Sequence, residues 1–317
     1  MNNKITLKQA CEFLKTHDNF AILTHASPDG DCLGSGYALM QVLNCIGKRA
    51  MVVCPDEIPN KFSYFAAGTE EFEYDTIISV DVADEQLLGE KKEEFSGKIE
   101  LAIDHHASNC GFAKALYLDT NAAAACECIY DIANELGVKI NHGIAAALYT
   151  GIATDTGCFK FSNTTPKTHR IAAELIELGV DFAEINRAMF DTKSRARLEI
   201  ERMALDNADY LFDGKAVCLC VSHKMIEESG CTDSDLDGLS VIARSVEGIS
   251  VAATMREKKP NFYKISLRTY DGIDASAICR LFGGGGHKAA AGCTISGNET
   301  EVKEKLYSAI NKALEDI

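Results

Sequence analysis

Short apolar runs alternate with segments of helical periodicity through the first part of the chain. The runs expected to form buried strands are FAILTH (20–25), AMVVC (50–54), TIISVDV (76–82) and ELAIDHH (100–106). The expected helices are 7–17, 32–47, 121–137, 142–155 and 165–179. Thr6 and Gln9 have the spacing of a capping box and mark the start of the first helix. This alternation predicts an α/β domain with a doubly wound, mostly parallel sheet.

The pattern changes near residue 190. Residues 191–212 are charged and helical in periodicity, which is typical of a helical linker. Beyond them we expect strands at 214–223, 248–257 and 262–270 and helices at 233–248 and 274–282. The last helix has a one-sided apolar stripe at Val302, Leu306, Ala309, Ile310, Ala313 and Leu314. The predicted organisation is therefore a domain at 1–190, a linker at 191–212 and a smaller α/β domain at 213–317.

Composition and charge narrow the classes of function. The formal charge of −15 over 317 residues argues against binding long duplex nucleic acid, whose affinity comes from many Lys and Arg contacts to phosphate. No apolar run approaches the roughly 18 residues of a membrane span, and the first residues lack the apolar core of a signal peptide. We therefore expect a cytoplasmic protein with no membrane partner. Its 13 cysteines should then be reduced and mostly buried.

Carboxylates and imidazoles gather where the predicted strands end, which is where open parallel sheets bind their ligands. The candidates are His25, Asp29, Asp31, Asp81, Asp104, His105, His106 and Asp155. Taken alone, an aspartate after a strand is most often a helix cap. Five carboxylates in one cleft, however, would repel one another unless they were protonated or neutralised by cations.

The donor set indicates which cations these would be. Mixed nitrogen and oxygen ligands suit Mn²⁺, Fe²⁺, Co²⁺ or Mg²⁺ and lack the thiolates of structural zinc sites. The pairs Cys126 with Cys128 and Cys218 with Cys220 are spaced too closely for a typical zinc site. Six ligands are too many for one catalytic ion with open positions, whereas two ions about 3.5–4 Å apart can share a bridging aspartate. The sequence therefore predicts a dinuclear centre.

A glycine-rich segment, FGGGGHKAAAG, covers residues 282–292. It is not a Walker A loop, because no Lys followed by Ser or Thr stands at the required place. Two interpretations remain open: a flexible hinge, or backbone N–H groups presented to an anion.

Together these motifs resemble a known family. HASPDGD, VDVAD, DHH and TDTG, in this order, are similar to the motifs of the DHH phosphoesterases, and GGGGHKAAAG resembles the glycine-rich motif of their DHHA1 domain. The resemblance covers nearly the whole chain. The two-domain length is most similar to the NrnA-type branch of nanoRNases and pAp phosphatases, where pAp is 3′-phosphoadenosine 5′-phosphate.

The resemblance implies a role for each candidate. His25 and Asp29 would hold one Mn²⁺, and Asp31, His105 and Asp155 would hold the other. Asp81 would bridge the ions, Asp104 would support a ligating imidazole without touching metal, and His106 would face the phosphate. The residues expected to bind the substrate's terminal phosphate or sugar are Gly284, Gly285, Gly286, His287, Arg268 and Arg244. Without the resemblance, Arg268 could equally be a surface charge and Arg244 a partner of a helix dipole.

The predicted function is two-metal hydrolysis of short RNA to mononucleotides and of pAp to AMP, with Mn²⁺ as the expected ion and Mg²⁺ or Co²⁺ as alternatives. Other readings stay open: a pApA or cyclic-dinucleotide phosphodiesterase, a family II-like inorganic pyrophosphatase, and a nonhydrolytic nucleotide sensor. The sequence leaves the oligomeric state open, a homodimer included.

Overall fold

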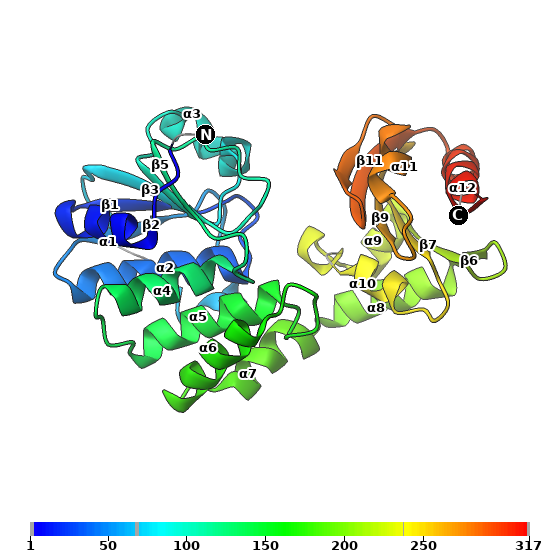
Figure 1. Cartoon of the computed structure of the whole chain (residues 1–317). Coiled ribbons are helices and arrows are strands. Elements are labelled where there is room, and N and C mark those ends of the chain that lie inside the picture. The colour runs from blue at the N-terminus through cyan, green and yellow to red at the C-terminus, as the bar shows by residue number, and fades with distance from the viewer. Residues whose placement is uncertain (1–2, 67–69, 237, 316–317) are drawn as a thin grey trace. The chain divides into compact units, whose positions relative to one another are not determined.

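The computed structural model describes residues 3–66, 70–236 and 238–315. The chain divides into two compact units, Met1–Thr192 and Lys193–Ile317, and each is described by itself (Figure 1). Within the described residues, no helix is long and apolar enough to cross a membrane.

The first unit contains a sheet of five parallel strands in the order β2-β1-β3-β4-β5. The strands are β1 (Phe20–Leu23), β2 (Ala50–Val53), β3 (Thr76–Val80), β4 (Leu101–Asp104) and β5 (Ala115–Leu118). The predicted parallel sheet is confirmed, with β5 as an edge strand that the sequence pattern did not reveal. The chain runs from β1 to β2 on one side and then returns from β2 to β3 on the other side of β1, so the topological switch point lies between β1 and β3.

Helices cover both faces of this sheet. The longer helices of the first unit are α1 (Leu7–Thr16), α2 (Gly30–Cys45), α4 (Ala125–Glu135), α5 (His142–Asp155) and α6 (Pro166–Glu177). The shorter ones are η1 (Asn60–Phe62), η2 (Glu85–Lys91), α3 (Lys92–Phe95), α7 (Phe182–Asn186) and η3 (Arg187–Asp191). Phe20 and Ile22 of β1 face the main core with α2 and α5, whereas Leu23 packs in a smaller core with Leu88 and Phe95 on the other face.

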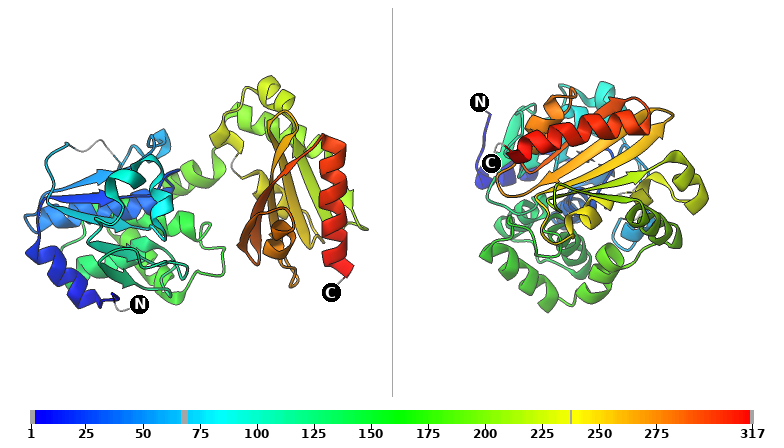
Figure 2. Two further views of the ribbon diagram at one scale, coloured as in Figure 1. Left: turned by 90° about the horizontal axis from the view of Figure 1, so that it is seen from above. Right: turned by 90° about the vertical axis from the view of Figure 1, so that its right-hand side faces the viewer.

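The second unit contains a six-stranded mixed sheet in the order β10-β11-β9-β8-β7-β6. The strands are β6 (Ala208–Leu211), β7 (Ala216–Val221), β8 (Val251–Lys259), β9 (Phe262–Thr269), β10 (Gly285–His287) and β11 (Ala290–Ser296). Its helices are α8 (Arg195–Asp206), α9 (His223–Ser229), η4 (Asp233–Leu236), α10 (Leu239–Arg244), α11 (Ala275–Arg280) and α12 (Glu299–Glu315). Figure 2 shows α12 lying across the sheet. The predicted stripe of α12 packs against the sheet, with Val302, Leu306 and Ile310 fully buried.

Several expectations at the level of elements were wrong. The end of segment 191–212 is not helical, because residues 208–211 form β6 and pair with β7. The single helix expected at 233–248 is two shorter helices, and Gly238 between them has a φ of 96°, outside the helical range. Asp237, within that expected helix, lies outside the described residues. The domain boundary at 190 and the linker limits remain predictions.

Candidate functional site

The candidate site lies where β1, β3 and β4 end, at the switch point of the first sheet. His25 follows β1, Asp81 follows β3 directly and Asp104 is the last residue of β4. Asp81 has a φ of 58°, a left-handed conformation that costs an aspartate of the order of 1 kcal/mol or more. The turn after β3 thus holds the Asp81 carboxylate at the switch point at the expense of backbone strain.

Helices α2 and α5 bring two more carboxylates to the site. Their close approach requires glycine: a Cβ at Gly34 would lie 2.5 Å from the Ala147 carbonyl oxygen, and a Cβ at Gly151 would lie 2.8 Å from Asp31 Oδ1. Asp31 lies in the first turn of α2, and Asp155 is the last residue of α5. The packing of these helices therefore sets the distance between Asp31 and Asp155.

Main-chain groups at the start of α4 hold the Asp31 carboxylate. The Ala125 N–H donates to Oδ2 at 2.6 Å, and the Cys126 N–H donates to Oδ1 at 2.9 Å. The N-terminus of a helix favours a negative charge. Asp29 instead caps α2, since its Oδ1 accepts from the N–H groups of Asp31 and Cys32. The capping interpretation is thus correct for Asp29.

Main-chain carbonyl groups fix the Nδ1 protons of two partly buried histidines. The His25 Nδ1 lies 2.8 Å from the Ala26 carbonyl oxygen, and the His105 Nδ1 lies 3.2 Å from the Ala122 carbonyl oxygen. Because a carbonyl oxygen only accepts, each Nδ1 carries the proton. Each Nε2 is therefore directed at the carboxylates, as in histidines that bind a metal through this nitrogen.

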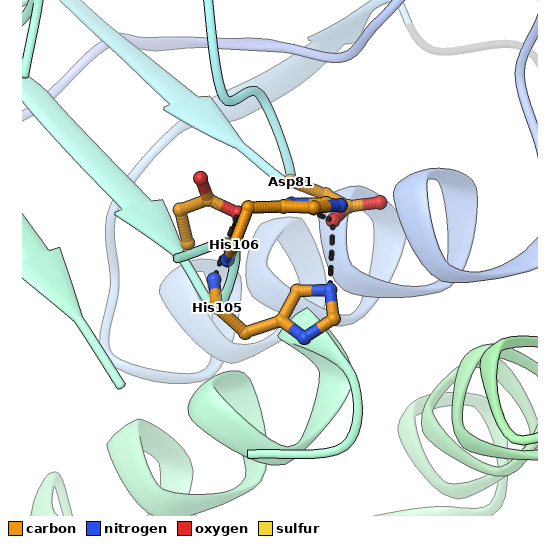
Figure 3. Close-up of side chains that lie close together, drawn as sticks. Asp81, His105 and His106 are labelled. Carbon is orange, nitrogen blue, oxygen red and sulfur yellow. Dashed lines mark hydrogen bonds and ion pairs between the residues drawn. The ribbon is translucent and has the colours of Figure 1, made fainter. Parts of the chain in front are cut away.

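Asp81 lies between the two histidines. Its Oδ2 is 3.7 Å from His25 Nε2, and its Oδ1 is 3.5 Å from His105 Nε2. The His105 Nε2 also lies 3.6 Å from Asp155 Oδ2 and 3.8 Å from Asp31 Oδ2, whereas the His25 Nε2 is 3.7 Å from Asp29 Oδ1. The rings of His105 and His106 both lie against the Asp81 carboxylate (Figure 3).

Three groups of side chains each offer ligand atoms within 4.8 Å of one another, and two of these groups share His105. They are His25 with Asp29 and Cys32; Asp31 with His105 and Asp155; and Asp81 with Asp104, His105 and His106. All eight residues that the sequence singled out in the first unit therefore lie together. Cys32 joins the first group although it is buried at the start of α2.

Two buried polar atoms at the centre fit a metal site. Among the described residues, Asp81 Oδ1 and His105 Nε2 are both buried without a hydrogen-bond partner. Because Nδ1 donates to the Ala122 carbonyl, the His105 Nε2 can face this carboxylate oxygen, 3.5 Å away, only with a proton or a cation between them. A divalent cation in place of that proton would bind both atoms.

The electrostatics of the cluster also favour cations. Burial, with the charges of Asp81 and Asp155, raises the pKa of Asp31 well above its usual value. Burial also raises the pKa of Asp155 to about 6, although His105 opposes this shift. Burial would lower the pKa of His105, but Asp81 and Asp31 raise it to about 10. A field that stabilises protons in this way also attracts metal ions.

Asp104 orients His106 rather than His105. The Asp104 Oδ1 accepts a hydrogen bond of 2.8 Å from His106 Nδ1, and its Oδ2 accepts one of 2.6 Å from the Asn109 amide. Although burial opposes the shift, these bonds hold the pKa of Asp104 below its usual value. In turn, the hydrogen bond with Asp104 raises the pKa of His106. Asn109 was not singled out from the sequence, and its position five residues after Asp104 was the only signal available.

The substrate-binding candidates of the second unit lie on its sheet. His287 is paired with Ala290, which is paired with Arg268, so their side chains follow one another across one face. Arg244, at the end of α10, donates from Nε to the Tyr270 hydroxyl at 2.8 Å. Burial, together with the positive charge of Arg244, lowers the pKa of Arg268.

The glycine-rich segment forms the hairpin of β10 and β11 rather than a hinge. Gly285 pairs with Gly292, and Gly286 pairs with Ala291. A Cβ at Gly284 would clash with the Gly292 carbonyl oxygen, and Gly286 has a φ of 143°. Two of these glycines are therefore required by the close contact of the two strands.

Comparisons with known proteins agree with this architecture. Residues 19–152 match the DHH family, N-terminal domain, and residues 214–316 match the DHHA1 domain. The bifunctional oligoribonuclease and PAP phosphatase NrnA of Thermus thermophilus is 34% identical over 304 residues, covering 92% of this chain and 89% of that protein. The protein of the same name from Bacillus subtilis is 27% identical over 289 residues, covering 89% and 91%.

A solved structure shows the same fold. An exopolyphosphatase-related protein from Bacteroides fragilis superimposes with a TM-score of 0.89 at 23% identity, covering 96% of this chain and 95% of that one. The family matches, the relatives and the two observed sheets together show that this chain belongs to the DHH/DHHA1 phosphoesterase family, in its NrnA-type branch.

Proposed function

We propose that this protein is a phosphoesterase that depends on two divalent metal ions, with Mn²⁺ preferred, and acts in the cytoplasm on short RNA and on pAp. Short RNA would yield mononucleotides, and pAp would yield AMP and phosphate. The relatives named oligoribonuclease and PAP phosphatase support this substrate class. The single observation that carries the proposal is a pair of buried atoms that face each other and have no hydrogen-bond partner among the described residues, Asp81 Oδ1 and His105 Nε2.

The proposed ligands follow the grouping of the side chains. His25 and Asp29 would hold one ion, and Asp31, His105 and Asp155 the other, with Asp81 shared because its two oxygens face different histidines. Nitrogen and carboxylate donors without a thiolate majority suit Mn²⁺. Bound ions of this kind supply an activated water and neutralise the charge of phosphate oxygens.

His106 is suited to the departing oxygen. Asp104 engages its Nδ1, which leaves Nε2 free to face a substrate, and the side chain is 42% exposed. The hydrogen bond with Asp104 raises the pKa of His106 above the usual value of an imidazole, which favours the protonated ring. That proton would stabilise charge on the phosphate or neutralise the leaving alkoxide.

In the second unit we assign Arg268, Arg244, His287 and the glycines 284–286 to binding of a terminal phosphate or sugar. A guanidinium fork matches phosphate oxygens, and the repulsion between Arg244 and Arg268 would be relieved by an anion. A few such contacts suffice for a substrate of one or two nucleotides.

The test is a substrate panel. Purified protein with Mn²⁺ is incubated separately with pAp, pApA, cyclic di-AMP and pyrophosphate, and release of AMP and phosphate is measured. We expect AMP from pAp and from pApA, and no phosphate from pyrophosphate. Asp81→Ala should lose nearly all turnover, because it removes the shared carboxylate.

Other outcomes would identify the rival functions. Phosphate release from pyrophosphate alone would assign the protein as a pyrophosphatase. Hydrolysis restricted to pApA and cyclic di-AMP would make it a dinucleotide phosphodiesterase. Tight pAp binding without hydrolysis would make it a sensor, and substantial activity in Asp81→Ala would refute the proposed mechanism.

A further inference from the structure

A buried carboxylate lies outside the candidate metal ligands. Glu127, on α4, has a fully buried side chain. Its Oε1 accepts a hydrogen bond of 2.6 Å from the Thr168 hydroxyl on α6, whereas its Oε2 is buried without a hydrogen-bond partner among the described residues. The Lys167 Nζ lies 3.9 Å from Oε2, but its shorter ion pair, at 2.7 Å, is with Asp131.

The turn that leads into the first turn of α4, where Glu127 lies, holds two of the proposed ligands. The Ala122 carbonyl oxygen accepts the Nδ1–H of His105, and the N–H groups of Ala125 and Cys126 bind the two oxygens of Asp31. Ala123 lies between these groups in the chain. A displacement of residues 122–126 would therefore move the His105 ring and the Asp31 carboxylate together.

A side chain from the segment before α6 holds the main chain of Ala123. The Asn163 amide donates to the Ala123 carbonyl oxygen at 2.9 Å. The same Asn163 amide donates to the Asp155 carbonyl oxygen at 3.1 Å. The turn is thus connected to the third residue of the same ligand group.

Thr168 is itself held in place by the capping box of α6. Its hydroxyl accepts from the Thr165 N–H at 3.0 Å while it donates to Glu127. The carboxylate of Glu127 therefore connects the start of α6 to the first turn of α4, which contains Ala125 and Cys126. Burying a carboxylate lowers the free energy of unfolding. Its hydrogen bonds offset part of this cost and fix a particular geometry.

We propose that Glu127 is a positioning residue of the metal centre, fixing the 122–126 turn so that His105 and Asp31 are held in the geometry that binds the ion. This inference rests on the proposed function for the identity of the centre. Glu127 contacts neither the ion nor the substrate. It acts through main-chain groups that contact the ligands.

The first test compares two variants of α4. Glu127→Ala should weaken Mn²⁺ binding by about 10- to 100-fold, the usual effect of losing a group that orients a metal ligand. Titration calorimetry on the full-length protein measures this directly. We also expect kcat to fall and to recover in part at high Mn²⁺, while the KM for pAp stays unchanged. Glu135→Ala, an exposed glutamate on the same helix, is the matched control.

The second test keeps the carboxylate and changes its partner. Thr168→Val removes the hydroxyl that bonds Glu127, whereas Thr168→Ser retains it. We expect weaker Mn²⁺ binding in the valine variant and wild-type affinity in the serine variant. If circular dichroism shows that Glu127→Ala does not fold, the two Thr168 variants still test the positioning role of Glu127.

A folded Glu127→Ala that binds Mn²⁺ with wild-type affinity would overturn the inference, as would equal affinities for the two Thr168 variants. Failure of the proposed function is a separate result. If the wild-type protein binds Mn²⁺ but hydrolyses none of the panel, the substrate assignment is wrong while the calorimetric comparison still tests Glu127.

Discussion

At the residue scale, the site concentrates unfavourable features at a few side chains. Asp81 has a left-handed backbone, and its Oδ1 is buried without a hydrogen-bond partner among the described residues. Asp31 is fully buried beside two other carboxylates. Each feature lowers stability by itself, and a bound cation would offset all of them. Metal binding and folding should therefore be coupled in this unit.

Metal binding should strengthen as the pH rises. Burial raises the pKa of Asp155 to about 6, and Asp81 and Asp31 raise that of His105 to about 10 against the effect of burial. These groups therefore hold protons below those pH values, and an ion must displace the protons to bind. Affinity should rise by up to about tenfold per pH unit for each proton released.

Calorimetry in buffers of different ionisation enthalpy counts the released protons. We expect net proton release on Mn²⁺ binding near pH 7, with less affinity at pH values below the pKa of Asp155. Affinity that is independent of pH, with no proton released, would contradict the electrostatic account of the cluster.

The sequence predicted the candidate metal-binding side chains better than it predicted the groups that orient them. The acidic and imidazole residues of the first unit lie together because they follow parallel strands, which end at one edge of a sheet. The groups that orient them include the Ala122 carbonyl and the Ala125 N–H. Such main-chain groups occur in every residue, so no residue type marks them. Asp104 was expected to support a ligating histidine, but it holds His106, which was not among the proposed ligands.

At the scale of elements, the packing of α2 on α5 determines the spacing of Asp31 and Asp155. Gly34 and Gly151 let the two helices approach, and any side chain at either position would meet main-chain atoms of the other helix. A change in this packing should therefore alter metal binding as well as stability.

Gly151→Ala tests this coupling. The added Cβ would clash with Cys126 Sγ and lie 3.0 Å from the Asp31 Cα. Overpacking of this kind costs about 1–3 kcal/mol, so thermal unfolding should occur at lower temperature and Mn²⁺ affinity should fall. Gly143→Ala is the control on the same helix, because its Cβ would mainly meet the flexible end of Gln41. Equal stability and affinity for the two variants would show that the close approach is unimportant.

The missed elements are mostly edge strands. β5 lies at one edge of the first sheet, and β6 and β10 lie at the two edges of the second. They contain three or four residues each, and β10 is Gly-Gly-His, which has no strand periodicity. Edge strands are often short and are stabilised by pairing with a neighbour rather than by burial of their own side chains. The buried strands β1, β3, β4 and β7 were predictable because their apolar residues are continuous.

At the scale of the whole molecule, the charge of −15 limits the substrate. A long polyanion would be repelled by the acidic surface, whereas one or two phosphates can be neutralised by metal ions and by the guanidinium groups of Arg244 and Arg268. The charge balance therefore favours the shortest substrates of the proposed class.

Rates on RNA of increasing length test this expectation. A dinucleotide should be hydrolysed faster than a single strand of roughly 24 nucleotides, longer than the site of one typical single-strand-binding fold. The KM for the dinucleotide should also depend only weakly on salt, since few phosphates are contacted. Faster hydrolysis of the long strand, or a steep salt dependence for the dinucleotide, would indicate an extended basic surface.

The contacts of His25 and His105 with carbonyl oxygens have a consequence for protein engineering. Both rings take their orientation from peptide carbonyl groups, and neither carbonyl is bonded to the carboxylate of Asp155, which could be replaced without removing these contacts. A designer could therefore exchange a carboxylate ligand to select a different metal while the two imidazole rings keep their orientation. The scaffold offers a pair of fixed nitrogen donors onto which other chemistries can be built.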